Sequence, residues 1–231
     1  MGGNEQTRWW TEDGVGYIVL DNPPMNVLSA ENRRGMLEAL AEFRRDDVRA
    51  AVITGAGDRA FCGGADLKEE QHLTEDTVDT FLERGQEVNR ALREWDRPVI
   101  GAINGWTMGG GLVLALWCDL RVASTRAKFG AVGVKVGLMA SNVQLTRFFT
   151  EARARDALLT GRTIEAEEAL RVGLVSSVVA PDALMAEATA WAQAIARRDP
   201  ALVARLKHAV NHALDGARDP ARAPAVAAAG R

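Results

Sequence analysis

The chain has 231 residues, of which 47% are hydrophobic and 26% are charged, with a formal net charge of -3. Interspersed charges exclude the basic stripe of a nucleic-acid-binding surface, and the longest apolar run, around 112–118, is far below the roughly 20 residues that cross a bilayer. The first ten residues lack the basic and apolar regions of a secretory signal. Two cysteines without zinc spacing and only three histidines argue against a metal site. We therefore expect a reduced, cytoplasmic protein with no nucleic-acid partner, no membrane contact and no metal.

Strands and helices alternate along the first half of the chain. Short apolar runs bounded by turn residues predict strands over 15–20, 50–54, 98–103 and 119–124. Apolar residues at helical spacing predict a helix after Ser29 as N-cap and a longer helix after Thr74. A further helix is expected to begin in the glycine run 109–111. This alternation predicts an α/β protein with parallel strand pairing.

Helices dominate the second half. The sequence predicts helices over 141–149, 152–160 and 163–173, the last with Thr163 as its N-cap and Gly173 at its end. A short strand is expected over 174–179, followed by helices over 182–198 and 200–214. The alanine- and proline-rich tail is expected to be disordered or to adapt to a neighbour. We divide the chain into a core of residues 10–180 and a helical C-terminal region of residues 181–231.

Two glycine-rich loops each follow a predicted strand. They are "FCGGADLKE", residues 61–69, and "NGWTMGGGL", residues 104–112. At a helix start the first N–H groups have no partner within the helix, and the helix dipole is positive there. Glycine lets a ligand atom approach such a backbone, and two amides aimed at one point from different loops form an oxyanion hole. The alternative is that the glycines only allow close helix packing.

A third glycine pattern, "ITGAGDRA", fits a dinucleotide-binding fingerprint loosely through Gly55, Gly57 and Ala60. That fingerprint requires a helix to start inside the motif. Here the chain continues "RAFCGGADLKE", in which no helix is expected before about Ala65. We interpret the pattern as a turn that leaves a strand.

The segments "AFCGGADLKE", "RPVIGAINGWTMGGGLVLALWCDLRVAS" and "AKFG" resemble the crotonase superfamily, the enoyl-CoA hydratase/isomerase family. The similarity extends to "NPPMNVLS", "LLTGRTIEAEEALRVGLVSSVV" and "LKHAVNHAL", and so covers nearly the whole chain. It implies an α/β crotonase (ClpP-like) spiral of β-β-α repeats with a C-terminal helical region, assembled as a homotrimer or hexamer. It also implies an acyl-CoA or acyl-carrier thioester as substrate, with coenzyme A as part of the substrate and no separate cofactor.

The resemblance assigns several residues. Ala65 and Gly110 match the two amides of the family's oxyanion hole, which hold the thioester oxygen as it becomes an enolate. Lys207 matches a C-terminal lysine that approaches the CoA phosphates, although a lysine on an exposed amphipathic helix is an equal alternative. The family's remaining CoA-contacting segments match Met25, Asn26, Ala65, Asp66 and Leu67.

Two glutamates of the family's hydratases have no counterpart here, because their positions are held by Val113 and Gly133. Adding water across a double bond requires a paired acid and base. The sequence therefore favours decarboxylase- or isomerase-type chemistry over simple hydration, with the oxyanion hole stabilising the enolate. The alternative is a catalytically idle acyl-CoA-binding or assembly partner of an active paralogue.

Other side chains are candidates for the pocket. His72 and Glu69 follow the first oxyanion loop and are candidate proton donors, since an imidazole titrates near neutral pH; a simply solvated segment is the alternative. Lys135 follows the "FG" motif and has a surface role as its alternative. The expected substrate pocket comprises Trp106, Met108, Val113, Gly133 and Asn142.

Overall fold

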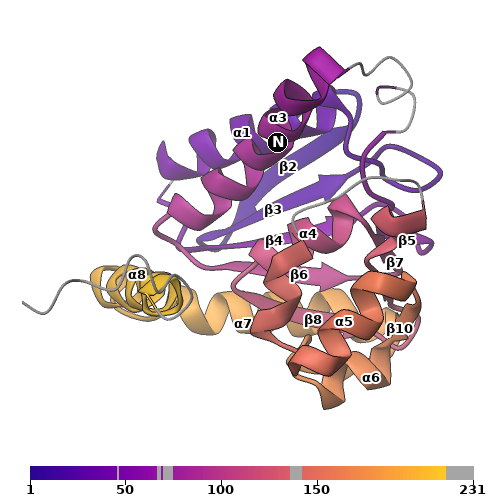
Figure 1. The fold of residues 1–231 in the computed structure, drawn as a ribbon. Helices are drawn as coiled ribbons and strands as arrows, with labels where there is room; N and C mark the ends of the chain where they lie inside the picture. The colour runs from indigo at the N-terminus through magenta and orange to yellow at the C-terminus, as the bar shows by residue number, and fades with distance from the viewer. Residues whose placement is uncertain (46, 67–68, 70–74, 136–141, 217–231) are drawn as a thin grey trace, which may run out of the picture.

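The computed structural model describes the whole chain except residues 46, 67–68, 70–74, 136–141 and 217–231, which are grey in Figure 1. The larger of its two sheets has seven strands in the order β1-β2-β3-β4-β6-β8-β11, of which β3 to β11 run parallel and β1 and β2 are antiparallel. The strands are β1 (Gly2–Gly3), β2 (Thr7–Glu12), β3 (Val15–Leu20), β4 (Ala50–Gly55), β6 (Val99–Ile103), β8 (Leu120–Ser124) and β11 (Ser177–Val179).

The second sheet has four short strands in the order β10-β9-β7-β5. They are β5 (Ala60–Cys62), β7 (Trp106–Met108), β9 (Lys128–Gly130) and β10 (Thr163–Glu165). Along the chain β4 is followed by β5, β6 by β7 and β8 by β9, so each turn gives one strand to each sheet. This arrangement confirms the α/β spiral of β-β-α repeats that the resemblance implies.

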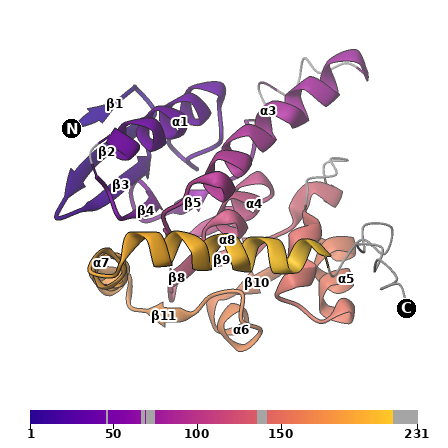
Figure 2. The same ribbon diagram turned by 90° about the vertical axis from the view of Figure 1, so that its left-hand side faces the viewer.

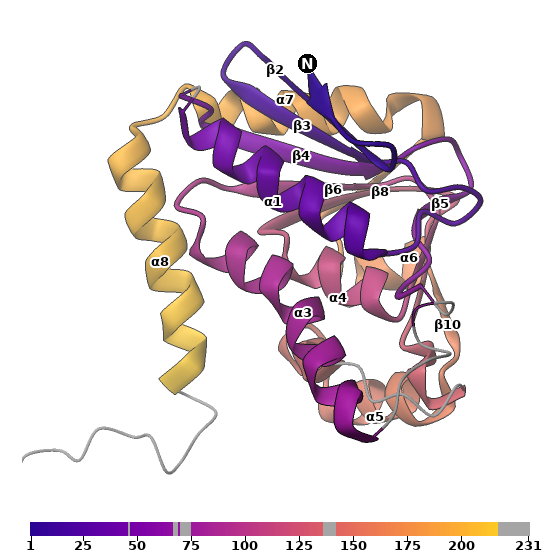
Figure 3. The same ribbon diagram turned by 90° about the horizontal axis from the view of Figure 1, so that it is seen from above.

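Helices cover both faces of the larger sheet (Figure 3). On one face, Ile18 of β3 packs in a cluster with Phe43 of helix α1 (Ala30–Arg45), beside α3 (Glu75–Glu94). On the other face, Tyr17 packs in a second cluster with Ala188 of α7 (Leu184–Ala196). Because β3 is buried on both faces, all six of its residues are buried and its sequence shows no polar alternation.

Helix α4 (Gly110–Trp117) lies inside the molecule, and its residues from Gly111 to Leu116 are all buried. A helix that is apolar all round needs such a position, which accounts for the run Leu112-Val113-Leu114. Among the described residues, the remaining helices are the 3-10 helices η1 (Val132–Lys135), η2 (Asn142–Arg147) and η3 (Pro181–Ala183), and the α-helices α5 (Glu151–Thr160), α6 (Ala166–Arg171) and α8 (Pro200–Gly216). Figure 2 shows α8 running across the front of the molecule.

Two predicted helices are wrong in part. Thr163 does not cap a helix, because Thr163–Glu165 pair with β9 as strand β10 and α6 begins only at Ala166; β-branched threonine and isoleucine suit that pairing. The segment predicted as an α-helix over 141–149 instead forms the 3-10 helix η2. At its end the Leu145 carbonyl accepts from the Phe148 amide, three residues on. The expected cap at Thr74 and the tail from 217 lie outside the described residues. The division at residue 180 stays a prediction.

Candidate active site

The two glycine-rich loops meet at one end of the smaller sheet. Their glycines follow β5 and β7, which are neighbouring parallel strands, so both glycine runs leave the sheet at the same ends of the strands. A β-carbon placed on Gly110 would lie 3.4 Å from the amide nitrogen of Ala65. In turn, a β-carbon placed on Gly64 would lie 3.4 Å from the amide nitrogen of Gly110. The structure thus brings the two predicted oxyanion amides to the border of one small space.

Hydrogen bonds fix the direction of both amides. The Gly64 carbonyl accepts from the Leu28 amide at 2.7 Å, and the Gly109 carbonyl accepts from the Val113 amide at 3.1 Å. In a trans peptide the carbonyl and the next N–H point in opposite directions. Holding those carbonyls therefore orients the Ala65 and Gly110 N–H groups. Within the described part of the chain neither N–H donates a hydrogen bond, which leaves both available to a ligand oxygen.

Each glycine of the triplet meets a different requirement. Gly109 has φ 51°, a left-handed conformation that side chains disfavour. Gly110 has an ordinary helical conformation, but a side chain there would enter the space between the two amides. A β-carbon on Gly111 would lie 2.1 Å from the Cys62 carbonyl oxygen, so α4 reaches the first loop only without one. The triplet therefore combines a turn, an open site and a close backbone contact.

Apolar groups border this space. Cδ1 of Leu28 lies 3.6 Å from the β-carbon position of Gly110, and Cγ2 of Val132 lies 3.7 Å from that of Gly109. Val113 is buried in the first turn of α4, and Gly133 is buried in η1. Leu28 was not predicted as a site residue. Its contacts here are made by its backbone N–H and an aliphatic side chain, and neither leaves a signal in a sequence.

The other predicted pocket residues are placed as follows. Met108 is buried, and its sulfur would meet a β-carbon on Gly130 at 2.7 Å. Trp106 is 37% exposed, with the Lys128 ammonium 5.3 Å from its ring centroid, so its ring lies at the surface. Asn142 begins η2, which packs against α4. Lys135 is exposed, and its Cε lies 3.0 Å from the β-carbon position of Gly161.

The predicted CoA-contacting residues cluster beside the first loop. The Met25 carbonyl accepts from the Gly63 amide at 2.7 Å. Asn26 is buried with φ 50°, and its side-chain amide donates to the carbonyls of Ala56 and Ala60. Asn26 therefore holds the turn against the strands. Asp66 follows Ala65 directly, and Leu67 lies outside the described residues; contact of this cluster with CoA stays a prediction.

Lys207 of α8 is buried and has three polar partners within the chain. Its ammonium donates to the Leu92 carbonyl at 2.9 Å and the Arg97 carbonyl at 3.0 Å, and it pairs with the Asp119 carboxylate at 2.9 Å. An ammonium has three donors, and all three are used. The lysine is 8% exposed, so the exposed-helix alternative is wrong, and its contact with a CoA phosphate stays a prediction. The sequence of α8 alone does not show that Lys207 binds the carbonyls of Leu92 and Arg97.

Of the two candidate proton donors, the structure describes only Glu69. One carboxylate oxygen of Glu69 accepts from the Ala30 amide at 2.7 Å, and the other pairs with Arg33 at 2.9 Å. Glu69 thus lies at the start of α1. His72 lies outside the described residues.

The two thiols are not candidate nucleophiles. Burial raises the pKa of Cys62 and of Cys118 to about 12, and the thiolate is the reactive form. Among the residues that are described, no group of three or more metal-ligating side chains is found. None of the described helices is long and apolar enough to span a membrane.

Comparison with known proteins identifies the family. The sequence model of the enoyl-CoA hydratase/isomerase family matches residues 10–226. The chain is 46% identical over 200 residues to the (E)-benzylidenesuccinyl-CoA hydratase of Thauera aromatica, covering 84% of this chain and 78% of that protein. It is 34% identical over 205 residues to the short-chain-enoyl-CoA hydratase of Clostridium acetobutylicum, covering 87% and 78%. The crystal structure of the Bacillus anthracis enoyl-CoA hydratase superposes with a TM-score of 0.86 at 30% identity, over 91% of this chain and 84% of that one. The chain therefore belongs to the enoyl-CoA hydratase/isomerase family of the crotonase superfamily.

Proposed function

We propose that the chain binds an acyl-CoA or acyl-carrier thioester with its carbonyl oxygen between the amides of Ala65 and Gly110. The observation that carries this proposal is that both N–H groups border one space and have no acceptor within the described chain. As the thioester becomes an enolate, its oxygen gains negative charge, and each such donor is worth about 3 kcal/mol in the transition state. Coenzyme A enters as part of the substrate, and no metal or separate cofactor takes part.

Within this proposal, decarboxylase- or isomerase-type chemistry is favoured over simple hydration. Val113 and Gly133 supply no carboxylate, and the carboxylate of Glu69 is bound at the start of α1. Decarboxylation needs no base, because the C–C bond to the carboxylate breaks, CO2 leaves, and the electron pair of that bond passes to the α-carbon as the thioester enolate. The enolate then takes a proton from water at the α-carbon. Leu28 and Val132 lie beside the glycine run, and we expect Val113 to form an apolar wall there. Apolar surroundings disfavour a charged carboxylate and so favour its loss.

Hydration is the second candidate, and the relatives favour it, since the Thauera aromatica protein is a hydratase. It would require an acid and a base other than residues 113 and 133. A catalytically idle partner that binds acyl-CoA is the third. The two oriented amides argue against an idle scaffold, which has no use for Gly110 at a helix start.

An exposed apolar stripe on α8 supports the proposal that copies of the chain assemble. Leu202, Leu206 and Val210 are 47%, 56% and 63% exposed and recur every four residues along α8. Such a stripe is left open to water only at a cost, and a second copy of the chain would cover it. The stripe is consistent with the homotrimer or hexamer that the resemblance to the crotonase superfamily implies.

Mass spectrometry after incubating purified protein with a thioester panel tests the reaction. The panel pairs short enoyl-CoAs with malonyl-type CoAs. Loss of CO2 from a malonyl-type thioester supports the decarboxylase proposal. Movement of the double bond leaves the mass unchanged, so proton NMR of the same samples detects it, and it supports isomerisation. Gain of water on an enoyl-CoA contradicts both and makes the protein a hydratase. Binding without turnover on either set favours the idle partner.

A further inference from the structure

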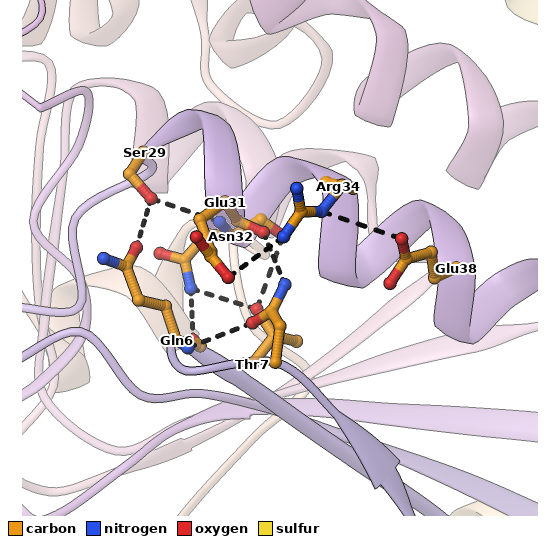
Figure 4. A network of polar contacts seen from close by, with 8 residues as sticks. Gln6, Thr7, Ser29, Glu31, Asn32, Arg34 and Glu38 are labelled. Carbon is orange, nitrogen blue, oxygen red and sulfur yellow. Dashed lines mark hydrogen bonds and ion pairs between the residues drawn. The ribbon is translucent and has the colours of Figure 1, made fainter.

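The start of helix α1 is tied to the larger sheet through a polar network (Figure 4). The Ser29 hydroxyl accepts from the Asn32 amide at 3.1 Å, which is an N-cap, and it donates to the side-chain oxygen of Gln6. The Asn32 side chain donates to the Thr7 hydroxyl at 3.1 Å and to the Gln6 carbonyl. Because Thr7 begins β2, the first turn of α1 has a fixed place relative to the sheet.

The same helix start binds the chain that follows the first oxyanion loop. One carboxylate oxygen of Glu69 accepts from the Ala30 amide at 2.7 Å, in the first turn of α1. The other oxygen pairs with the Arg33 guanidinium at 2.9 Å. A carboxylate at a helix start also interacts favourably with the positive end of the helix dipole. The Arg33 side chain is only 11% exposed, so water screens this pair less than a surface pair.

Leu28 connects this ion pair to the oxyanion amide. Arg33 donates from its other terminal nitrogen to the Leu28 carbonyl at 2.8 Å. The Leu28 amide in turn donates to the Gly64 carbonyl at 2.7 Å, and Leu28 forms an isolated parallel bridge with Ala65. The Gly64 carbonyl and the Ala65 N–H belong to one peptide plane, so whatever holds Leu28 also sets the direction of that N–H.

We propose that Arg33 and Glu69 are positioning residues that hold the Ala65 amide in the orientation needed for the thioester oxygen. This inference rests on the proposed function. Arg33 binds the Leu28 carbonyl with one terminal nitrogen and Glu69 with the other, and Glu69 binds Ala30. Glu69 then contributes through its charge and its two hydrogen bonds, and it transfers no proton, unlike the role that its sequence position suggests.

The substitutions separate the parts of this arrangement. Glu69→Gln keeps an acceptor for the Ala30 amide but removes the charge that faces Arg33. Arg33→Lys keeps the positive charge but not the fork that reaches Leu28 and Glu69 together. Arg34→Ala is the matched control, since Arg34 lies on the same helix and is 61% exposed, in surface pairs with Glu31 and Glu38. Thermal unfolding of each variant shows that it is folded.

The experiment measures the carbonyl stretch of bound acetyl-CoA, labelled with carbon-13 at the thioester carbonyl, by infrared difference spectroscopy. In the unaltered protein the stretch moves to lower frequency than in water, because two N–H groups polarise the carbonyl. Glu69→Gln and Arg33→Lys lose most of that displacement, and Arg34→Ala keeps it. On the substrate found in the panel, kcat of Glu69→Gln falls about 10-fold and KM changes less than about two-fold, since misalignment costs less than loss of a donor.

The outcomes distinguish failure of this inference from failure of the proposed function. No displacement in the unaltered protein overturns the proposed function, and the inference with it. Full displacement in folded Glu69→Gln and Arg33→Lys overturns the inference and leaves the proposed function standing. The pH profile of kcat gives a further reading: it keeps its shape in Glu69→Gln if Glu69 positions the amide, and it loses a limb if Glu69 transfers a proton.

Discussion

A β-carbon on Gly110 would lie 3.4 Å from the amide nitrogen of Ala65 and 3.6 Å from Cδ1 of Leu28. These are ordinary contact distances, so a methyl group fits there without moving its neighbours. It would nevertheless occupy the space between the two amides. We therefore expect Gly110→Ala to fold normally, with a free energy of unfolding unchanged or raised by up to about 1 kcal/mol. Its kcat/KM should fall by about 100-fold or more, because the thioester oxygen no longer reaches both donors.

Gly85→Ala is the matched control. Gly85 lies in α3, and a β-carbon there meets nothing within 4 Å. Denaturation should show that both variants are as stable as the unaltered protein, while only Gly110→Ala loses turnover. An active Gly110→Ala would show that the substrate oxygen does not lie between these amides.

Gly111→Ala, unlike Gly110→Ala, should destabilise the fold. Its β-carbon would lie 2.1 Å from the Cys62 carbonyl oxygen and 2.8 Å from Cys62 Cβ, and neither backbone can yield without moving β5 or α4. We expect a loss of stability of about 3 kcal/mol or more, from overpacking inside the core. Urea denaturation measures it. A stable Gly111→Ala would mean that α4 and β5 are further apart than the structure places them.

We expect substitution of Lys207 to lower the free energy of unfolding. Lys207→Met removes the donor for two carbonyls and leaves the Asp119 carboxylate without its cation. Removing one partner of a buried pair costs about 3 kcal/mol, near the lower end of the usual range because Asp119 keeps some exposure. Arg205→Met is the control, since Arg205 is exposed on the same helix. Equal stability of the two variants in urea would show that α8 does not dock through Lys207.

Strands β3, β4, β6, β8 and β11 of the larger sheet were predicted from residue patterns. Strands β1 and β2 of that sheet, and the smaller sheet, were not. Strand β3 is predicted with its observed bounds, because six apolar residues followed by a turn leave few alternatives. Strands β5, β7 and β9 have three residues each, too few to show any period. The resemblance to the crotonase superfamily supplied what periodicity did not.

Within the site, the two glycine-rich loops form a pattern along the chain, and the resemblance to the crotonase superfamily assigned Ala65 and Gly110 within them. The residues that support these loops were not predicted. Leu28 acts through an N–H that every non-proline residue has. The bonds of Glu69 and Lys207 join residues far apart in sequence, so that only the folded chain shows them.

The apolar stripe on α8 predicts an assembly that one charge should disrupt. Leu206→Glu places a carboxylate in the middle of Leu202, Leu206 and Val210, where burial against another copy would cost several kcal/mol. Size-exclusion chromatography with light scattering should give a trimer or hexamer for the unaltered protein and smaller species for Leu206→Glu. Leu159→Glu is the control, since Leu159 is 71% exposed on α5. Dissociation by Leu159→Glu alone would place the interface on α5.

Because both thiols are buried, we expect the free energy of unfolding to fall in alkali. Burial raises the pKa of Cys62 and Cys118 to about 12, whereas a thiol in the unfolded chain titrates near about 8.5. An acid whose folded pKa is raised contributes its full stabilisation below the unfolded pKa and loses it as the pH rises toward the folded value. Between these values the unfolded chain holds fewer protons, so each thiol lowers the free energy of unfolding by about 1.4 kcal/mol per pH unit.

Urea denaturation at a series of pH values measures this slope. The double variant Cys62→Ala with Cys118→Ala is the control, because it removes the thiol contribution to the slope and keeps the contributions of lysine and tyrosine. The difference in slope between the two proteins should approach about 2.7 kcal/mol per pH unit. At pH 8 the same burial predicts that a thiol reagent leaves the folded protein unmodified and reacts with both cysteines in urea. Rapid modification of the folded protein would contradict the burial of β5 behind α4, on which the placement of Gly110 beside Ala65 depends.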